Sequence, residues 1–312
     1  VMSVVAGGLS GSPLEGRSIE EKRAAENFRK AEAYANSGRP LQAIGKFESM
    51  VSRSRETEYA AKAQFRIAEL YRENDRLEDS FNAYQGFLDG FPKSNLYGKA
   101  ISGQMAVVDR VLELWRREAI SGVAPDKKKV PRKEELGKMM KIVRGNGRYT
   151  RYAPEILYKS GVVFQQERKN VSARAAFAEI LEKHKKHELA DDAGFQYAYI
   201  DFKKVAEGDW RSKMRAEIGM LDFLQKFPDS EKVPQAQHCL KRLREMEAAR
   251  LVEHAQRYRV LGGDNSARTY LQKAFTEYPD ETEKIKGARL LLNSLLKEMP
   301  SPTRPSPSSI SR

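Results

Sequence analysis

The chain has 312 residues, 40% of them hydrophobic, which is enough apolar material for a sizeable core in one or two domains. Charged residues make up 32% and the formal net charge is +13, and no apolar run approaches the ~20 residues of a transmembrane helix. The single cysteine, Cys239, excludes an internal disulfide and a cysteine-based zinc site.

The first 18 residues are predicted to lie outside the folded part of the chain. Residues 1–8 are small and mostly apolar, and Ala6 and Gly8 are spaced like the small residues of a secretory cleavage site. A stretch rich in Gly and Ser follows, up to Gly16. Two interpretations of residues 1–18 stay open, which are the remnant of a secretory signal and a flexible N-terminal tail.

From about Ile19 to Leu296 the apolar residues recur with the helical period, and the pattern itself repeats. Each repeat combines a small residue, an aromatic, a second small residue and a large apolar residue at constant spacing. Small and large residues must alternate in this way where two antiparallel helices approach closely. The units that fit are Ala31/Tyr34/Ala43/Phe47, Ala68/Tyr71/Ser80/Tyr84, Gly161/Phe164/Ala173/Phe177 and Ala255/Tyr258/Ala267/Leu271.

Each unit is predicted to reverse direction at a polar stretch between its two helices. These turns are residues 36–39, 73–76, 167–170 and 262–265. Gly262 and Gly263 belong to no phosphate-binding pattern, so we assign them to the last turn. The hairpins together predict an all-α fold, a tetratricopeptide-repeat superhelix of about five to six antiparallel helix hairpins.

Two units depart from the pattern. In the first, an apolar stripe that ends at Trp115 is followed by a basic loop and by a short helix that we expect to stop at Gly145-Asn146-Gly147. In the second, residues 190–230, extra residues are inserted around Trp210. The predicted organisation is N-terminal repeats at 19–95, the degenerate repeat with its basic loop at 96–151, C-terminal repeats at 152–298 and a disordered Pro- and Ser-rich tail at 299–312.

No catalytic, cofactor-binding or metal-binding motif stands out. His184 and His187 are flanked by lysines and lie where the other units turn from one repeat to the next, so no metal ion is predicted there. His238 and Cys239 are adjacent, and adjacent side chains on a helix diverge by about 100°, which argues against a catalytic dyad. The sequence therefore predicts a protein that is not an enzyme and binds no cofactor or metal.

The first helix of each hairpin is expected to line the concave face of the superhelix, where a peptide gains affinity from many small contacts. Mixed charge on this face suits a peptide main chain and a C-terminal carboxylate. The two phenylalanines have a second interpretation, as core between hairpins, and the charged residues have one as solvated surface. The predicted peptide-binding residues are Phe28, Glu32, Asn36, Lys62, Phe65, Glu69 and Arg72.

The positive charge gathers in runs such as Lys127-Lys128-Lys129. The first interpretation of such a run is a solvated loop or face. The second is contact with an anionic membrane surface or an acidic partner. Nucleic acid is not expected as a partner, because no binding motif with interleaved aromatic residues accompanies the charge.

The ends of the hairpins carry the most specific motifs. Phe91-Pro92-Lys93-Ser94 and Phe227-Pro228-Asp229-Ser230 close two hairpins, and Tyr278-Pro279-Asp280 closes the last. Together with Tyr152-Ala153-Pro154-Glu155 at the start of another, they resemble the BamD (YfiO) outer-membrane assembly lipoproteins and the related TolA-binding periplasmic proteins. The resemblance extends over about Ile19 to Leu296.

This resemblance implies a non-catalytic adaptor at the periplasmic face of the bacterial outer membrane, which contacts the barrel-assembly machinery and captures unfolded outer-membrane proteins. In that family the N-terminal repeats are associated with substrate and the C-terminal repeats with the machinery. The family carries a lipid on an N-terminal cysteine, whereas the cysteine here is Cys239, so either the true start lies upstream or this member is not lipidated. The alternatives are a TolA-binding-type envelope scaffold and a basic cytoplasmic helical repeat that binds nucleic acid.

Overall fold

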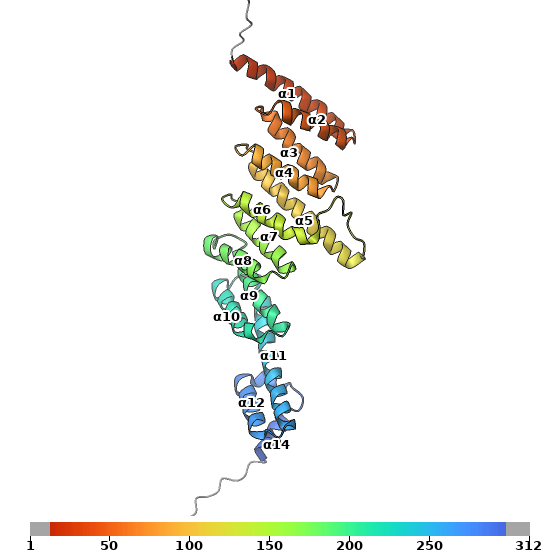
Figure 1. The fold of residues 1–312 in the computed structure, drawn as a ribbon. Helices are drawn as coiled ribbons and strands as arrows, with labels where there is room; N and C mark the ends of the chain where they lie inside the picture. The colour runs from red at the N-terminus through yellow and green to blue at the C-terminus, as the bar shows by residue number, and fades with distance from the viewer. Residues whose placement is uncertain (1–12, 298–312) are drawn as a thin grey trace, which may run out of the picture. The chain divides into compact units, whose positions relative to one another are not determined.

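The computed structural model describes residues 13–297, with side chains from residue 19 onward. Every regular element in this range is a helix, without any strand, so the predicted all-α fold is confirmed (Figure 1). The chain divides into two compact units between Ala190 and Asp191. Residues 1–12, with the signal-like start, and the predicted tail at 299–312 lie outside the described residues.

The first unit is a series of four hairpins in which each helix packs against the next (Figure 1). Its elements are α1 Pro13–Asn36, α2 Pro40–Arg53, α3 Glu58–Glu73, α4 Leu77–Gly90, α5 Tyr97–Ser121, the short 3-10 helix η1 Lys133–Glu135, α6 Leu136–Gly147, α7 Ala153–Gln166 and α8 Asn170–Lys183. The start of α1 corrects one expectation, because residues 13–18 are helical rather than tail. Proline at the first position of a helix, as Pro13 is here, is pre-organised for the helical backbone.

The second unit adds two further hairpins and two short helices, and the six hairpins found within residues 13–297 agree with the predicted number. Its elements are α9 Ala190–Ala206, the 3-10 helix η2 Trp210–Ser212, α10 Lys213–Lys226, α11 Val233–Val260, α12 Asp264–Glu277, α13 Pro279–Glu283 and α14 Ala288–Lys297. Helix α11 is continuous because neither Gly nor Pro occurs between Pro234 and Gly262. One half of α11 packs with α9 and α10, and the other half packs with α12.

The repeat pattern marks the contact between paired helices. In the first hairpin Ala31 and Ala43 are completely buried, and Phe47 fills the space beside them. In the fourth hairpin Gly161 lies so close to Phe177 that a Cβ atom added to the glycine would overlap the ring. The small residues of the pattern are therefore required by the distance between the helices, as the sequence predicts.

The predicted turns also form. The chain reverses through one residue with left-handed backbone in each: Gly38 (φ 72°), Asp75 (φ 54°), Arg168 (φ 57°) and Gly262 (φ 75°). Glycine adopts this conformation without steric cost, and a single aspartate tolerates it better than most residues.

The predicted end of α6 lies within the expected three residues, because the helix ends at Gly147. It includes Gly145 and Asn146, which the sequence alone places at the stop. A Cβ atom at Gly147 would overlap the side chain of Ile156, so this glycine serves close packing against α7. Asn146 donates hydrogen bonds to Gln85 (2.8 Å) and Gln104 (2.9 Å) from within the helix. Tertiary contacts thus outweigh the weak helix propensity of these residues.

Replacing Ala43 with leucine should lower the free energy of unfolding by ~1–3 kcal/mol, because the larger side chain overpacks a site with no spare volume. Ala43 is 0% exposed. The matched control is Lys30→Leu, since the Lys30 side chain is 65% exposed and its ion pair with Glu26 lies at the surface, where such pairs contribute little. Urea denaturation compares the two variants, and equal losses would mean that the repeat register is assigned wrongly.

Candidate peptide-binding site

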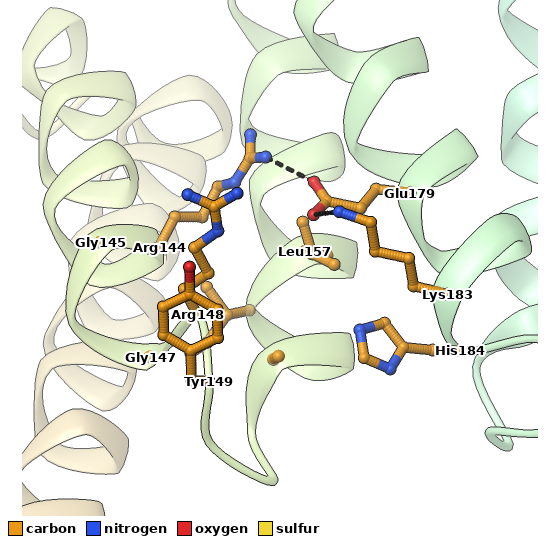
Figure 2. Close-up of a pocket in the computed structure, with 11 residues that line it drawn as sticks. Arg144, Gly145, Gly147, Arg148, Tyr149, Leu157, Glu179, Lys183 and His184 are labelled. Carbon is orange, nitrogen blue, oxygen red and sulfur yellow. Dashed lines mark hydrogen bonds and ion pairs between the residues drawn. The ribbon is translucent and has the colours of Figure 1, made fainter.

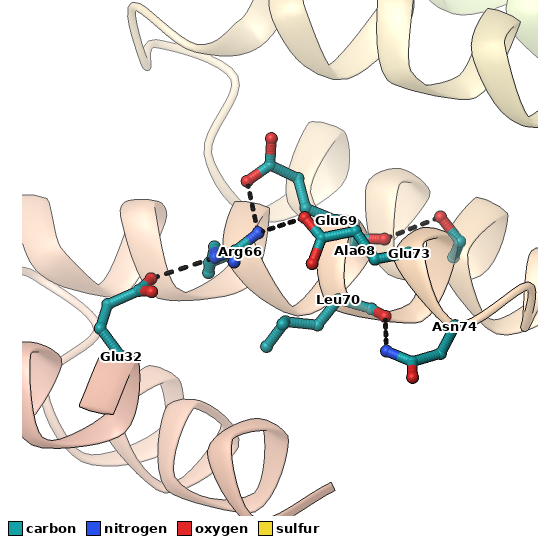
Figure 3. Close-up of polar contacts among 8 residues, drawn as sticks. Glu32, Arg66, Ala68, Glu69, Leu70, Glu73 and Asn74 are labelled. Atoms are coloured by element: carbon teal, nitrogen blue, oxygen red, sulfur yellow. Dashed lines mark hydrogen bonds and ion pairs between the residues drawn. The ribbon is translucent and has the colours of Figure 1, made fainter. Parts of the chain in front are cut away.

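The predicted peptide-binding residues lie on α1 and α3, the first helices of the first two hairpins, which contact each other. At their centre is Arg66 of α3, which the sequence analysis did not select (Figure 3). Its Nε donates a hydrogen bond to Glu32 of α1 at 3.1 Å, and its Nη1 donates to Glu69 at 3.3 Å and to Glu73 at 2.8 Å. One guanidinium therefore joins the two helices and brings together two of the predicted residues, Glu32 and Glu69.

This network is acidic overall, because three carboxylates surround one cation. Burial lowers the pKa of Arg66, but the hydrogen bond with Glu73 and the charges of the three carboxylates together raise it above its usual value. The side chains of Glu32 and Glu73 are 26% and 49% exposed, so a ligand can reach both carboxylates. Ionised carboxylates are acceptors only, and they suit the N–H groups of a peptide main chain or a cationic side chain.

The two bases expected to bind a C-terminal carboxylate differ from each other. Lys62 Nζ lies 2.8 Å from Glu58 and 4.8 Å from the centre of the Tyr59 ring, and the hydrogen bond to Glu58 raises the pKa of Lys62. Arg72 is half-buried on the same helix and makes no ion pair with any residue from 19 to 297. Arg72 is therefore available to a ligand carboxylate, while Asn36 is exposed at the end of α1.

Both predicted phenylalanines pack against aromatic rings on the second helix of their own hairpin, so both rings contribute to core packing. The Phe28 ring lies 5.1 Å from that of Phe47, measured between centroids. Phe65 lies edge-on to Tyr84 and to Phe87, at 5.6 and 5.7 Å. Aromatic pairs at these distances stabilise the packing beyond their area burial. Replacement of either ring should therefore lower the free energy of unfolding more than it weakens peptide binding.

A pocket of about 520 Å³ lies farther along the first unit, between α6, α7 and α8 (Figure 2). On its wall Arg144 and Lys183 both donate to the carboxylate of Glu179, at 2.8 and 3.0 Å. Burial raises the pKa of Glu179, but the hydrogen bond from Lys183 and the charge of Arg144 outweigh it and hold the pKa below its usual value. At the rim the Arg148 guanidinium lies 5.4 Å from the centre of the Tyr149 ring. The apolar floor is formed by Ala153, Ile156 and Leu157.

Three cations face one carboxylate in this pocket, so it suits an anionic group joined to an apolar one. Sequence reasoning missed the pocket, because Arg144 and Arg148 precede α7 while Lys183 ends α8. Nothing in the local pattern of either segment shows that the fold brings them to one place.

The two histidines predicted to lie in a turn do so. The backbone N–H of His187 donates to the His184 carbonyl at 2.9 Å, and His187 Nδ1 accepts from the N–H of Leu189 at 3.2 Å. Ser94 Oγ accepts from the N–H of Leu96 in the same way. His187 therefore replaces the serine of the Phe-Pro-x-Ser turns. Across residues 19–297 no three His, Cys, Asp or Glu side chains form a group that could hold a metal ion.

Cys239 is buried in the core that α11 shares with α9 and α10. Burial raises the pKa of its thiol to about 11, so the thiol stays protonated at neutral pH and is a poor nucleophile. His238 is exposed on the same helix. The adjacent pair therefore has the arrangement of ordinary helix residues rather than that of a catalytic dyad.

The stacked hairpins and their charged helix faces define a helical-repeat protein, and comparison with known families specifies the repeat. Residues 62–94 match the tetratricopeptide repeat family. This stretch includes most of α3, all of α4 and the Phe-Pro-Lys-Ser turn. Tetratricopeptide repeats are modules that bind other proteins, so a protein-binding role follows for this hairpin. No curated protein matches the chain.

Several solved structures are similar to this chain. A tetratricopeptide repeat protein from Parabacteroides merdae is 14% identical, covers 88% of this chain and 99% of its own, and has a TM-score of 0.35. The C-terminal part of a repeat protein from Cytophaga hutchinsonii is 12% identical, covers 89% of this chain and 94% of its own, and has a TM-score of 0.41. The pilF protein of Pseudomonas aeruginosa is 14% identical, covers 91% of this chain and 100% of its own, and has a TM-score of 0.32. These likenesses concern the helical-repeat fold alone.

Proposed function

We propose that the protein is a non-catalytic adaptor that binds polypeptide segments on the shared face of α1 and α3. The observation that carries this proposal is the network of Arg66 with Glu32, Glu69 and Glu73 (Figure 3). It holds partly exposed hydrogen-bond acceptors at fixed positions on two packed helices. A surface that is ordered before binding loses little conformational freedom when a peptide is added.

Binding on this face is distributed over several contacts. The carboxylates of Glu32, Glu69 and Glu73 accept hydrogen bonds from peptide N–H groups or from cationic side chains. Arg72 pairs with a carboxylate of the ligand, such as a free C-terminus. The match of residues 62–94 to a protein-binding repeat supports this location, because α3 belongs to that repeat.

Within this class we propose a role of the BamD type, at the periplasmic face of the bacterial outer membrane, with unfolded barrel precursors as ligands and the barrel-assembly machinery as partner. The inter-hairpin turns support the resemblance, since Ser94 N–H donates to Phe91 O at 3.0 Å and Ser230 N–H donates to Phe227 O at 3.2 Å. The signal-like start of the sequence supports the location. Fractionation of the native protein into the cytoplasm would rule this role out.

Titration with a fluorescein-labelled segment of an unfolded outer-membrane barrel protein tests peptide binding. Glu32→Gln/Glu69→Gln should weaken binding about tenfold, because neutral amides accept hydrogen bonds less strongly than carboxylates. Arg72→Gln should weaken binding of the segment with a free C-terminus but not of the same segment amidated, and the difference should shrink as salt rises. Lys46→Gln, an exposed position on α2, is the control. Unchanged affinity in both site variants, with thermal unfolding intact, would refute binding at this face.

A further inference from the structure

We propose that the end of α5 and the loop after it dock on the surface of an anionic lipid bilayer. The segment concerned is residues 116–133, called the docking segment below. It is separate from the peptide-binding face, and the proposal does not depend on peptide binding. The contact is with the bilayer surface, since no helix in residues 13–297 is long and apolar enough to cross a membrane.

The docking segment exposes two aliphatic side chains. Ile120 is 89% exposed in the last turn of α5, and Val123 is 73% exposed just after it. The buried residues of α5 end at Leu112, so the helix continues beyond the part that packs in the core. Figure 1 shows the C-terminal end of α5 extending past the neighbouring helices of the first unit. Aliphatic groups in such a position lose contact with water when they enter the boundary between lipid headgroups and acyl chains.

The same segment carries a high density of positive charge. It holds seven Lys and Arg but only two acidic residues, Glu118 and Asp126. None of these seven cations forms an ion pair with a residue in the described part of the chain. Unpaired basic residues beside exposed aliphatic ones are the combination that binds anionic headgroups while apolar groups insert. The seven cations are Arg116, Arg117, Lys127, Lys128, Lys129, Arg132 and Lys133.

The loop is held in place by contacts of its backbone with α4 and α5 and by one buried side chain. The carbonyl of Lys129 accepts from the N–H of Leu77 at 2.7 Å, at the start of α4. Trp115 Nε1 donates to the carbonyl of Pro131 at 3.0 Å, and Val130 is 4% exposed. These contacts fix the loop while leaving the side chains of the three lysines in solvent, so little order must be gained on docking.

The apolar residues favour a membrane over nucleic acid. Proteins that bind single-stranded nucleic acid present aromatic rings on which bases stack. The exposed side chains here are isoleucine and valine, which offer no stacking surface, whereas the one aromatic residue of the region, Trp115, is engaged with Pro131. The test must therefore distinguish binding to a membrane surface from binding to nucleic acid.

Co-sedimentation of the full chain with lipid vesicles tests the proposal. The protein should sediment with vesicles that contain phosphatidylglycerol and not with vesicles of phosphatidylcholine alone. Lys127→Glu/Lys128→Glu should lower the fraction bound by about tenfold or more, because both charges are reversed near the surface. Ile120→Asp/Val123→Asp should lower it comparably, through loss of insertion. All four positions are exposed, so circular dichroism of the variants should be unchanged.

The control is Val171→Asp, which changes an 83% exposed valine on α8 of the same unit and should leave vesicle binding intact. Absence of the wild-type protein from the phosphatidylglycerol pellet would overturn the proposal. So would full binding by the Ile120→Asp/Val123→Asp variant, which would show attraction without insertion. Binding to single-stranded DNA in place of the vesicles, with the same dependence on Lys127 and Lys128, would identify a nucleic-acid surface instead.

Discussion

Phe177→Ala is expected to lower the free energy of unfolding by ~3–5 kcal/mol, because it removes a fully buried ring and leaves a cavity. Phe177 is 0% exposed between α7 and α8, where its ring lies against Gly161 and, at 5.6 Å between centroids, edge-on to Tyr158. Urea or thermal denaturation of the full chain measures the loss. A change as small as that of an exposed substitution would contradict the packing of the fourth hairpin.

The partner glycine makes the test specific. Gly161→Ala should cost ~1–3 kcal/mol, because the added Cβ overlaps the Phe177 ring. In the double variant the ring is gone and the new methyl group occupies part of its space, so the combined loss should be smaller than the sum of the two single losses. Gly45→Ala is the control, since a Cβ at Gly45 of α2 meets nothing within 4 Å. This control should not destabilise, because alanine is the better helix former.

Gln104→Leu is expected to cost ~1–3 kcal/mol although it makes a buried position more apolar, because it removes two hydrogen bonds, one to each of two half-buried amides. Gln104 is 0% exposed on α5 and donates to Gln85 of α4 at 3.0 Å. It also accepts from Asn146 of α6 at 2.9 Å, and Asn146 donates to Gln85 at 2.8 Å. The three amides join three helices in one network.

The matched control for this network is Gln225→Leu, at an exposed position on α10. Replacing all three amides with leucine should cost less than the sum of the single changes, because each hydrogen bond of the network is shared by two residues and is lost only once. If Gln104→Leu and Gln225→Leu unfold at the same denaturant concentration, the network contributes nothing to stability.

The hairpins could be predicted from the sequence because their determinants are local. The spacing of Gly161 and Phe177 reports the contact between two helices that are joined by a short turn. The left-handed backbone at Gly38 and Gly262 could be predicted from the residue type, because glycine adopts positive φ angles readily. In both cases the residues that decide the structure are near one another in the chain, so periodicity and turn chemistry suffice.

The remaining features depend on neighbours that are distant in sequence. Gly147 ends α6 as expected, but its close contact with Ile156 of α7 has no signal in the local sequence. Arg66 gave no signal, because its partner Glu32 lies on another hairpin. Arg144 and Lys183 meet only through the carboxylate of Glu179 once α6 and α8 are in place. Some residues of the α1–α3 face were thus predicted, whereas its organisation around Arg66 was not. The basic pocket between α6, α7 and α8 was not predicted either.

The central claim, that polypeptides bind on the face shared by α1 and α3, is tested most directly by site-specific photo-crosslinking. A benzophenone amino acid placed at Arg72 should crosslink an unfolded barrel-protein segment under ultraviolet light. The same probe at Lys46, exposed on α2, should not. We expect a crosslinked product at position 72, and we expect an excess of the unlabelled segment to prevent its formation. Crosslinking only at Tyr149, on the rim of the pocket between α6 and α8, would contradict the claim and move the binding site there.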